Sequence, residues 1–395
     1  MQQLFINARL IIPSEDAGLR GSLLVENGVI KSVITEGMIT PKISPEDVDL
    51  VIDCDDDYIF PGLIDIHCHG AMGRDAMEAT PEAYEIILRY HLSQGTTLAV
   101  LSTVAAPLDA MLRVLTSAEE YKTTSGGVFL AGIHLEGPYF AVTRRGAHRE
   151  SYLRDPTSEE TRRLLNHKKI ISRMTLAPEI PGTAELISEF IRNGISVSAG
   201  HSDASEAESN MGFDHGVTQV THLYNCMSSQ QSRFGRRTAG LAEAALTRPG
   251  ILCELIADGV HLPATLLRLA WMAKGWKELI LVSDATAGAG LGEGAQFELG
   301  EIPCQILDGA AWTGEATERR LAGSTASLLK GVRFMVEEVD IPFWEAVSMA
   351  SLVPAKALGI EQDRGSIALG KRADLVRVSR TWQVRDVWSA GAQVA

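Results

Sequence analysis

The amino-acid sequence predicts an α/β fold: a (β/α)8 barrel of the TIM type with a small β-sandwich domain formed from both chain termini. Between about residues 62 and 355, eight short apolar runs alternate with longer amphipathic stretches, as parallel strands alternate with their covering helices. No glycine-rich dinucleotide fingerprint follows the first run, which favours a closed barrel over an open doubly wound sheet. Both ends of the chain instead carry short β-like segments separated by turn residues.

The first sixty residues are predicted to form the strands of a small sheet. Residues 4–12 and 21–34 alternate or run apolar, and Asn27-Gly28 marks a hairpin turn inside the second stretch. The C-terminal tail repeats this β-rich texture. The other expected segments are 51–53, 58–60, 365–368, 370–372, 374–378 and 383–388. We therefore expect one β-sandwich domain built from residues 1–60 and 361–395.

The barrel itself is expected over residues 61–360. Its eight apolar runs are 62–66, 97–101, 130–135, 173–176, 195–199, 219–221, 252–256 and 279–282. The helical stretches between them include 81–93, 159–166, 183–193 and 264–274. In such a barrel, catalytic side chains collect where the strands end, at the carboxyl face.

Composition narrows the classes of partner. The 395 residues include 36 Lys and Arg against 50 Asp and Glu, a net charge of −14, which argues against nucleic acid or an anionic membrane surface as the partner. No apolar segment reaches the ~18 residues of a membrane span. The first ten residues do not have the pattern of a signal peptide. Five scattered cysteines, without a CxxC pair, make a reducing cytoplasm the simplest expected location.

The sharpest local feature is the segment DIHCHG at 65–70, directly after the first apolar run. Residues two apart on a strand point to the same side, so His67 and His69 can converge on one ion. Imidazole suits Zn and Fe. The alternative is a pair of unrelated surface histidines, which this pair alone does not exclude.

Four further strand ends carry the same kinds of side chain. Glu136 ends the third apolar run, His201 the fifth, His222 the sixth and Asp284 the eighth. Imidazoles and carboxylates gathered at successive strand ends predict a divalent-metal site that activates water and polarises a carbonyl or phosphoryl group. A carboxylate outside the inner shell can then move the proton of that water, and Asp284 is our candidate.

Longer motifs around these residues identify a family. They are PGLIDIHCHG (61–70), HLEGPYF (134–140), AGHSDA (199–204), THLYNCM (221–227), ADGVHL (257–262), SDATAG (283–288), LAGST (321–325) and ALGKRADLV (368–376). Over nearly the whole chain they resemble the amidohydrolase superfamily and, within it, the family of N-acetylglucosamine-6-phosphate deacetylases. HLEGP, HLYN and DGVHL are the more specific pieces.

The resemblance implies roles for single residues. It makes Glu136, His201 and His222 ligands of a principal metal, and His67 and His69 ligands of a second metal that only some members bind. One or two divalent ions per subunit, Zn or Fe, are therefore expected.

Asp284 resembles the family's general base and then general acid, and His261 the histidine that polarises the acetamide carbonyl or contacts the sugar. Further residues would line the sugar and phosphate: Ala147, His148, Asn225, Cys226, Leu321, Ala322 and Gly323.

The phosphate loop departs from the family pattern. Members carry an Arg-Glu-Pro-Gly turn whose arginine reaches the phosphate of a neighbouring subunit, and this implies a homodimer. Here the loop 233–240 is longer and lacks the Glu and Pro, and Arg237 aligns best with that arginine.

The implied reaction is metal-dependent hydrolysis of N-acetyl-D-glucosamine 6-phosphate to D-glucosamine 6-phosphate and acetate, in amino-sugar catabolism. The altered loop leaves an alternative open, the same chemistry on N-acetylgalactosamine 6-phosphate, an unphosphorylated N-acetyl sugar or an N-acyl amino acid. A non-catalytic barrel that serves as a binding protein is the other alternative.

Overall fold

The computed structural model describes residues 1–12, 18–36, 44–124, 129–233, 235–315 and 317–395. Eight parallel strands form one sheet in the order β17-β16-β13-β12-β11-β10-β9-β6. Their bounds are β6 Leu63–Cys68, β9 Thr96–Ser102, β10 Leu130–Glu136, β11 Ile171–Leu176, β12 Ser196–Ala199, β13 Gln219–Val220, β16 Leu252–Ile256 and β17 Leu279–Val282. Each coincides with one of the eight apolar runs, which confirms the predicted barrel.

Backbone contacts at the carboxyl end bring the first and last strands together. The N–H of Asp284, just after β17, donates to the carbonyl of His67 in β6 at 2.9 Å. Cys68 and Ala285 continue this contact as a parallel bridge. The barrel is therefore nearly closed, and the ends of β6 and β17 lie side by side.

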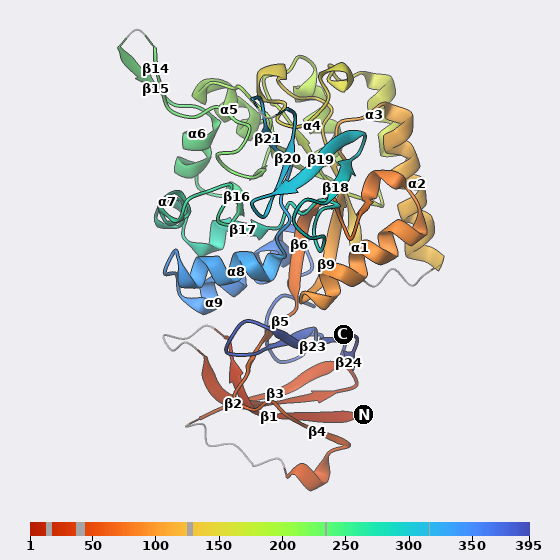
Figure 1. Cartoon of the computed structure of the whole chain (residues 1–395), viewed down its shortest axis with the longest axis vertical. Helices are drawn as coiled ribbons and strands as arrows, with labels where there is room; N and C mark the ends of the chain where they lie inside the picture. The colour runs from red at the N-terminus through yellow and green to blue at the C-terminus, as the bar shows by residue number, and fades with distance from the viewer. Residues whose placement is uncertain (13–17, 37–43, 125–128, 234, 316) are drawn as a thin grey trace.

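Helices surround the barrel (Figure 1). They are α1 Pro81–Ser93, α2 Leu108–Thr124, α3 Ser158–Leu165, α4 Thr183–Arg192, α5 Glu206–Asp214, α6 Leu241–Thr247, α7 Ala264–Lys274, α8 Leu328–Glu337, α9 Phe343–Met349 and α10 Leu352–Ala357. Short 3-10 helices are η1 Pro45–Asp47, η2 Ala76–Glu78, η3 Val142–Arg144, η4 Glu150–Tyr152 and η5 Trp276–Glu278.

The first helix shows how the sequence sets these bounds. Thr80 caps α1 by accepting a hydrogen bond from the N–H of Ala83, and Pro81 occupies the first turn, where no N–H is needed. Its apolar face is buried. Of the helices that the structure describes, none is long and apolar enough to cross a membrane.

Both chain ends contribute to a second sheet, which lies at the amino end of the barrel strands (Figure 1). Its strands run β24-β23-β22-β5-β1-β2-β3, and β4 pairs with β1. They are β1 Gln2–Leu10, β2 Leu19–Glu26, β3 Val29–Thr35, β4 Leu50–Asp53, β5 Tyr58–Pro61, β22 Leu375–Val378, β23 Val384–Ser389 and β24 Ala392–Gln393.

This sheet has an apolar cluster of its own, in which Phe5 packs edge-on against Trp388 with ring centroids 4.9 Å apart. Asn27 and Gly28 adopt positive φ angles between β2 and β3, as the predicted hairpin requires. The domain boundaries at 60/61 and 360/361 stay a prediction.

Two short strands predicted in the C-terminal tail, at 365–368 and 370–372, are wrong. Gly365 and Gly370 turn with φ angles of +84° and +83°, and this segment leads from α10 back to the sheet. Only Arg372 pairs there, in an isolated bridge with Val29.

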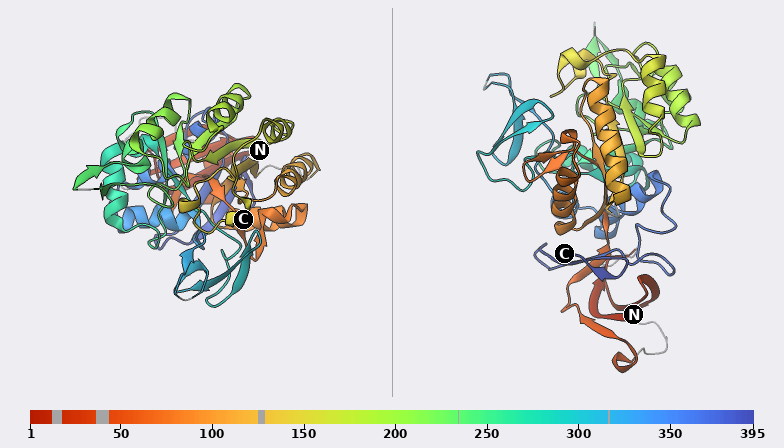
Figure 2. Two further views of the ribbon diagram at one scale, coloured as in Figure 1. Left: turned by 90° about the horizontal axis from the view of Figure 1, so that it is seen from above. Right: turned by 90° about the vertical axis from the view of Figure 1, so that its right-hand side faces the viewer.

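Two insertions depart from the simple barrel pattern. A four-stranded antiparallel sheet follows β17 and lies beside the barrel mouth (Figure 2), with β18 Gln296–Leu299, β19 Ile302–Leu307, β20 Ala310–Thr313 and β21 Arg320–Leu321. A hairpin of β14 Gln231–Arg233 and β15 Arg236–Thr238 projects from the carboxyl side (Figure 1). A third, short pair is β7 Gly70–Ala71 with β8 Arg74–Asp75. None of these was expected from the sequence.

Gly62 lies where the chain passes from the terminal sheet into β6. A substitution there tests how tightly this junction packs against β9. A Cβ on Gly62 would overlap the side chain of Thr97 in β9, 2.8 Å from its Cβ. We expect Gly62→Ala to lower the free energy of unfolding by about 1–3 kcal/mol, because neither backbone can move away without strain. Urea unfolding followed by circular dichroism measures the change.

Gly331→Ala is the matched control, because its Cβ would meet only ordinary contacts at 3.8 Å within α8. There we expect no loss, and up to about 1 kcal/mol of gain from the better helix former. Equal stabilities for the two variants would contradict the tight junction at Gly62.

Candidate active site

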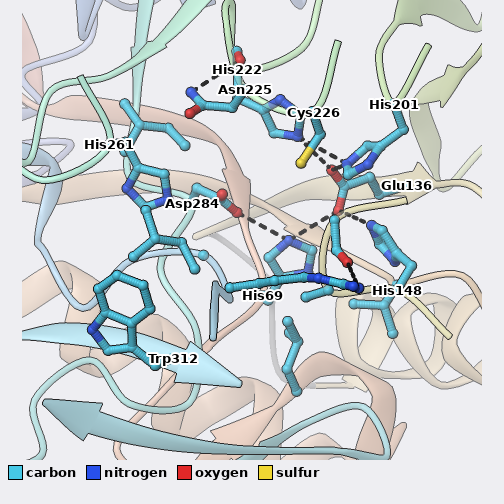
Figure 3. A pocket seen from close by; sticks show the side chains of 18 residues that line it. His69, Glu136, His148, His201, His222, Asn225, Cys226, His261, Asp284 and Trp312 are labelled. Atoms are coloured by element: carbon cyan, nitrogen blue, oxygen red, sulfur yellow. Dashed lines mark hydrogen bonds and ion pairs between the residues drawn. The ribbon is translucent and has the colours of Figure 1, made fainter. Parts of the chain in front are cut away.

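The ends of the barrel strands surround a cavity of about 430 Å³ (Figure 3). Histidines and carboxylates from different strands line it together with the edge of the β18–β21 sheet. The lining residues are His69, Val104, Glu136, Gly146, Ala147, His148, His201, His222, Asn225, Cys226, Ile256, His261, Asp284, Leu299, Trp312, Arg320, Leu321 and Gly323. The polar residues predicted at the strand ends thus meet in one place.

Strained backbone aims several of these side chains inward. His201, His222 and Asp284 have φ angles of 48°, 32° and 48°, in the left-handed region that residues with a side chain rarely adopt. Each lies two residues beyond the end of its strand, where the backbone turns out of the strand direction. Such conformations cost on the order of 1–3 kcal/mol each and persist where the surrounding structure imposes them, typically at functional sites.

Glu136 lies at the centre of the cluster. Its Oε1 is 3.3 Å from Nε2 of His201 and 3.3 Å from Nε2 of His222, and those two nitrogens are 3.1 Å apart. Ligands bound tetrahedrally at 2.0–2.1 Å from Zn²⁺ are separated by about 3.3 Å. The three atoms therefore have the spacing of one face of a metal coordination shell.

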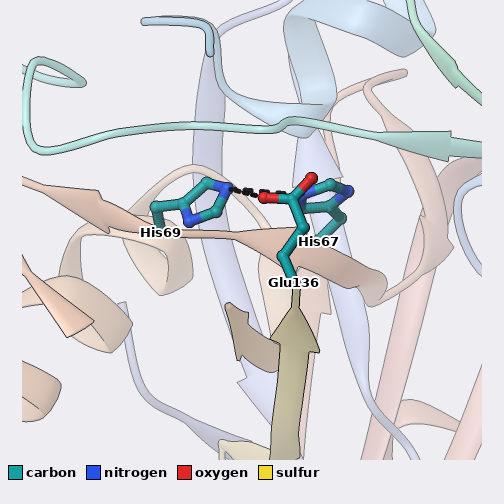
Figure 4. Close-up of side chains that lie close together, drawn as sticks. All are labelled: His67, His69 and Glu136. Carbon is teal, nitrogen blue, oxygen red and sulfur yellow. Dashed lines mark hydrogen bonds and ion pairs between the residues drawn. The ribbon is translucent and has the colours of Figure 1, made fainter. Parts of the chain in front are cut away.

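His67 and His69 also face the carboxylate of Glu136 (Figure 4). Nε2 of His67 and Nε2 of His69 are 3.3 Å apart, and they lie 3.5 Å and 3.3 Å from the two oxygens of Glu136. His67, His69 and Glu136 are close enough to hold one ion. These donors would therefore suit a second divalent ion beside the first.

Hydrogen bonds behind the rings fix two of the imidazoles in the form a metal needs. Nδ1 of His201 lies 2.9 Å from the carbonyl oxygen of Arg144, which can only accept, so in the neutral ring the proton is on Nδ1 and Nε2 keeps its lone pair. Nδ1 of His67 lies 3.1 Å from Oε2 of Glu254 with the same consequence. Partners of this kind orient ligands and raise their basicity.

The carboxylates of the site stabilise positive charge. Burial lowers the pKa of His69, but hydrogen bonds to Asp284 and Glu136 outweigh this effect and raise the pKa to about 9. Burial likewise lowers the pKa of His201, and its side-chain contacts with Cys226 and Glu136 raise it to about 10. A field that holds protons this firmly also attracts a divalent cation, which competes with those protons.

Asp284 borders both His67 and His69 at the cavity wall. Its Oδ1 is 3.4 Å from Nε2 of His67 and 3.2 Å from Nε2 of His69. Burial raises the pKa of Asp284, but these two histidines lower it below its ordinary value, so the carboxylate is ionised and able to accept a proton.

His261 faces the same cavity and is held by Asp258, whose Oδ2 accepts from Nδ1 at 2.8 Å. The other oxygen of Asp258 accepts from the backbone N–H groups of Val260 and His261. Burial lowers the pKa of His261, and Asp258 raises it above its ordinary value. The raised pKa favours the protonated ring, in which Nδ1 donates to Asp258 and Nε2 is a second hydrogen-bond donor.

His148 differs from the four histidines around Glu136. Its Nδ1 accepts a hydrogen bond from the backbone N–H of Ala105 at 3.2 Å. Burial, helped by the neighbouring His201, lowers the pKa of His148 to about 3, so the ring is neutral and its single proton is on Nε2. His148 therefore presents a donor to the cavity, which suits a ligand oxygen and disfavours direct metal coordination.

The structure brings most of the predicted site residues to this cavity and leaves three outside its lining. His67 is fully buried beneath it, and Ala322 packs inside the apolar cluster of the inserted sheet. Arg237 lies exposed on β15, away from the cavity of its own chain. Contact between Arg237 and a substrate would therefore require a second subunit.

Known proteins share both the sequence pattern and this arrangement of residues. The sequence profile of the amidohydrolase family matches residues 58–394. This chain belongs to the amidohydrolase family. The amidohydrolase is 33% identical to the N-acetylglucosamine-6-phosphate deacetylase of Vibrio furnissii, over 85% of this chain and 82% of that one. It is 32% identical to the N-acetylgalactosamine-6-phosphate deacetylase of Escherichia coli O157:H7, over 91% and 93%.

Solved structures agree with the sequence comparison. The crystal structure of N-acetylglucosamine-6-phosphate deacetylase from Pasteurella multocida superposes with a TM-score of 0.91 at 30% identity, over all of both chains. A mutant of the Mycobacterium smegmatis deacetylase, in complex with N-acetyl-D-glucosamine-6-phosphate, gives 0.87 at 28% identity, over 100% of this chain and 98% of that one. The fold of the amidohydrolase described here is thus that of sugar-phosphate deacetylases.

Sequence reasoning missed the charged layer beneath the cavity. Glu254 and Arg173 are buried in the middle of β16 and β11 and form an ion pair. Glu254 also accepts from the backbone N–H of His222 at 3.2 Å, besides its contact with His67. A charge inside an apolar strand needs a partner, so LCELI at 252–256 and ISRMTL at 171–176 could have revealed the pair.

The buried pair yields a stability prediction. Glu254→Ala leaves the guanidinium of Arg173 buried without a countercharge, so we expect the free energy of unfolding to fall by about 3–5 kcal/mol. Urea unfolding of the metal-free protein isolates this effect from metal binding. Glu159→Ala, which breaks an exposed pair with Arg162, is the control and should cost no more than about 1 kcal/mol. Similar losses in the two variants would refute the buried-pair explanation.

Proposed function

We propose that this amidohydrolase hydrolyses the N-acetyl group of N-acetyl-D-glucosamine 6-phosphate, giving D-glucosamine 6-phosphate and acetate in amino-sugar catabolism. The observation that carries the proposal is the cluster of four imidazoles on Glu136 with Asp284 beside it, in a cavity large enough for one sugar. Relatives at 30–33% identity that match it over most of both chains are deacetylases of amino-sugar 6-phosphates.

The residues proposed to hold metal are those whose ring nitrogens face Glu136. His201, His222 and Glu136 would bind the principal ion, and His67 and His69 together with Glu136 a second one. A divalent ion, Zn or Fe by ligand type, would lower the pKa of water and polarise the acetamide carbonyl.

The chain's own residues then move the proton and bind the sugar. Asp284, ionised at neutral pH, accepts a proton from the attacking water and returns it to the departing nitrogen. His261, oriented by Asp258, donates to the acetamide oxygen or a sugar hydroxyl, and His148 donates through Nε2. Asn225, Cys226 and the Leu321–Gly323 edge would enclose the sugar, partly through backbone groups.

The same site could act on the galactose epimer, because the Escherichia coli relative at 32% identity is a deacetylase of N-acetylgalactosamine 6-phosphate. We further propose a homodimer, by resemblance to the family. We propose the cytoplasm as its location, since all five cysteines are free thiols, as expected in a reducing compartment.

A matched panel of sugars tests the proposal. The panel is N-acetylglucosamine and N-acetylgalactosamine, each with and without a 6-phosphate, and acetate release is measured for each. We expect the highest kcat/KM for N-acetylglucosamine 6-phosphate. Preference for an unphosphorylated sugar would overturn the phosphate part of the proposal, and no acetate from any of the four would overturn it entirely.

Asp284→Asn tests the proton-transfer role. Asparagine keeps the shape of the side chain but cannot accept the proton, so we expect kcat to fall by at least about 100-fold. Metal content, measured by mass spectrometry on the purified variant, should stay that of the wild type. Asp203→Asn changes an exposed aspartate two residues from His201 and should leave kcat within about twofold. Full activity in Asp284→Asn would end the assignment.

A further inference from the structure

The proposed substrate carries a phosphate, and the described cavity offers one permanently charged cation for it. Among the residues that line the cavity, Arg320 is the single lysine or arginine in the part of the chain that the structure describes. Arg237, the arginine expected from the family pattern, lies on the projecting β14–β15 hairpin. The one permanently charged cation in this lining is therefore Arg320, a residue that the sequence motifs did not identify.

Arg320 begins β21 at the edge of the inserted sheet, where its exposed side chain contributes to the cavity lining. It pairs with Thr313 across β20 and β21, next to the pair of Trp312 and Leu321, which also line the cavity. Its Nη1 lies 3.5 Å from the carbonyl oxygen of Gly146.

Gly146 connects this guanidinium to the sugar-facing loop. A Cβ placed on Gly146 would lie 2.7 Å from Sγ of Cys226 and 3.4 Å from Cε1 of His201. Gly146 thus packs directly between Arg320 and the segment that would hold the sugar.

A second cavity, of about 540 Å³, continues from the first and shares four wall residues with it: Gly146, Ala147, His148 and Arg320. The charges around it decide where an anion would lie. Its other arginines are already paired, Arg145 with Glu150 at 3.5 Å and Arg149 with Glu301 at 3.8 Å. Arg320 has no carboxylate within 4.0 Å over the described ranges.

Glu315 and Glu318 also line the second cavity and would repel a phosphate there. The first cavity has its acidic groups, Glu136 and Asp284, gathered at the metal cluster. The guanidinium of Arg320, which contacts the carbonyl of Gly146 and has no carboxylate partner among the described residues, is therefore available to an anion on the side of the first cavity.

We propose that Arg320 binds the 6-phosphate of the substrate from within the same chain and sets the preference for phosphorylated sugars. This inference rests on the proposed deacetylase function. A guanidinium can donate two parallel hydrogen bonds to phosphate oxygens, and its charge is permanent at every physiological pH. Each chain then carries a complete site, and phosphate binding does not depend on Arg237 of a second subunit.

The test compares Arg320→Gln with the wild type on N-acetylglucosamine 6-phosphate. We expect KM to rise by about 10- to 100-fold, because charge-assisted hydrogen bonds to the phosphate are lost. We expect kcat to stay within about threefold, because the residues around Glu136 are unchanged. Arg320→Lys should recover part of the loss. Activity on unphosphorylated N-acetylglucosamine, where measurable, should not change.

Arg319→Gln is the matched control: it removes the same charge from the neighbouring exposed residue, which lines neither cavity. Its KM should equal that of the wild type. If Arg237→Gln raises KM and Arg320→Gln does not, the phosphate is read by the hairpin and the proposal is wrong. It is equally wrong if Arg320→Gln lowers activity on both sugars alike.

Calorimetry with inorganic phosphate separates this inference from the proposed function. Binding that is at least tenfold weaker in Arg320→Gln than in the wild type supports the anion site even if no sugar releases acetate. Equal binding by the two proteins, or no binding by the wild type, overturns the role of Arg320. Equal metal content and equal midpoints of thermal unfolding for the variants exclude a folding defect as the cause.

Discussion

The convergence of four imidazole nitrogens on the carboxylate of Glu136 is the constraint on which the rest of this structure depends. The ring nitrogens lie in two buried pairs, His201 with His222 at 3.1 Å and His67 with His69 at 3.3 Å. Lone pairs this close repel one another, so positive charge between them is needed to make the arrangement favourable. Protons provide part of it, as the raised pKa values of His69 and His201 indicate. A divalent ion held by these residues would supply the rest, and with it the activation of water for hydrolysis.

Holding these groups together costs free energy that the barrel must supply. Three features oppose folding. They are the left-handed backbone beyond three strand ends, the buried ion pair of Arg173 and Glu254, and the desolvation of Asp65, whose burial raises its pKa to about 6. Continuous apolar packing between strands and helices offsets them. Because Glu254 bonds to both His67 and the backbone of His222, the costly pair also places two of the rings.

The sequence predicted what depends on local pattern. Apolar runs located all eight strands, and polar residues at their ends located His67, Glu136, His201, His222 and Asp284, because the carboxyl ends of parallel strands share one face. Glu254 was missed: a charge inside an apolar strand signals a buried partner, but closure of the barrel decides that this partner is Arg173. Arg320 was missed for a similar reason: β20 and β21 are short, and only their tertiary pairing brings this residue to the cavity.

The protein has a net charge of −14, and the proposed substrate is also an anion. Binding is still favourable if positive charge lies locally in the cavity. A metal beside Glu136 and the guanidinium of Arg320 would hold the reacting amide and the phosphate at two separate points, so the sugar between them has one orientation. The backbone also links the two points. Four residues after Arg320, the N–H of Ser324 donates to the carbonyl of Asp284 at 2.7 Å, and the carbonyl of Ser324 accepts from Thr286 at 3.0 Å. The segment 320–324, which would bind the phosphate through Arg320, therefore also holds the backbone of Asp284, which would move the proton. Substrate binding and catalysis would thus depend on the same short segment.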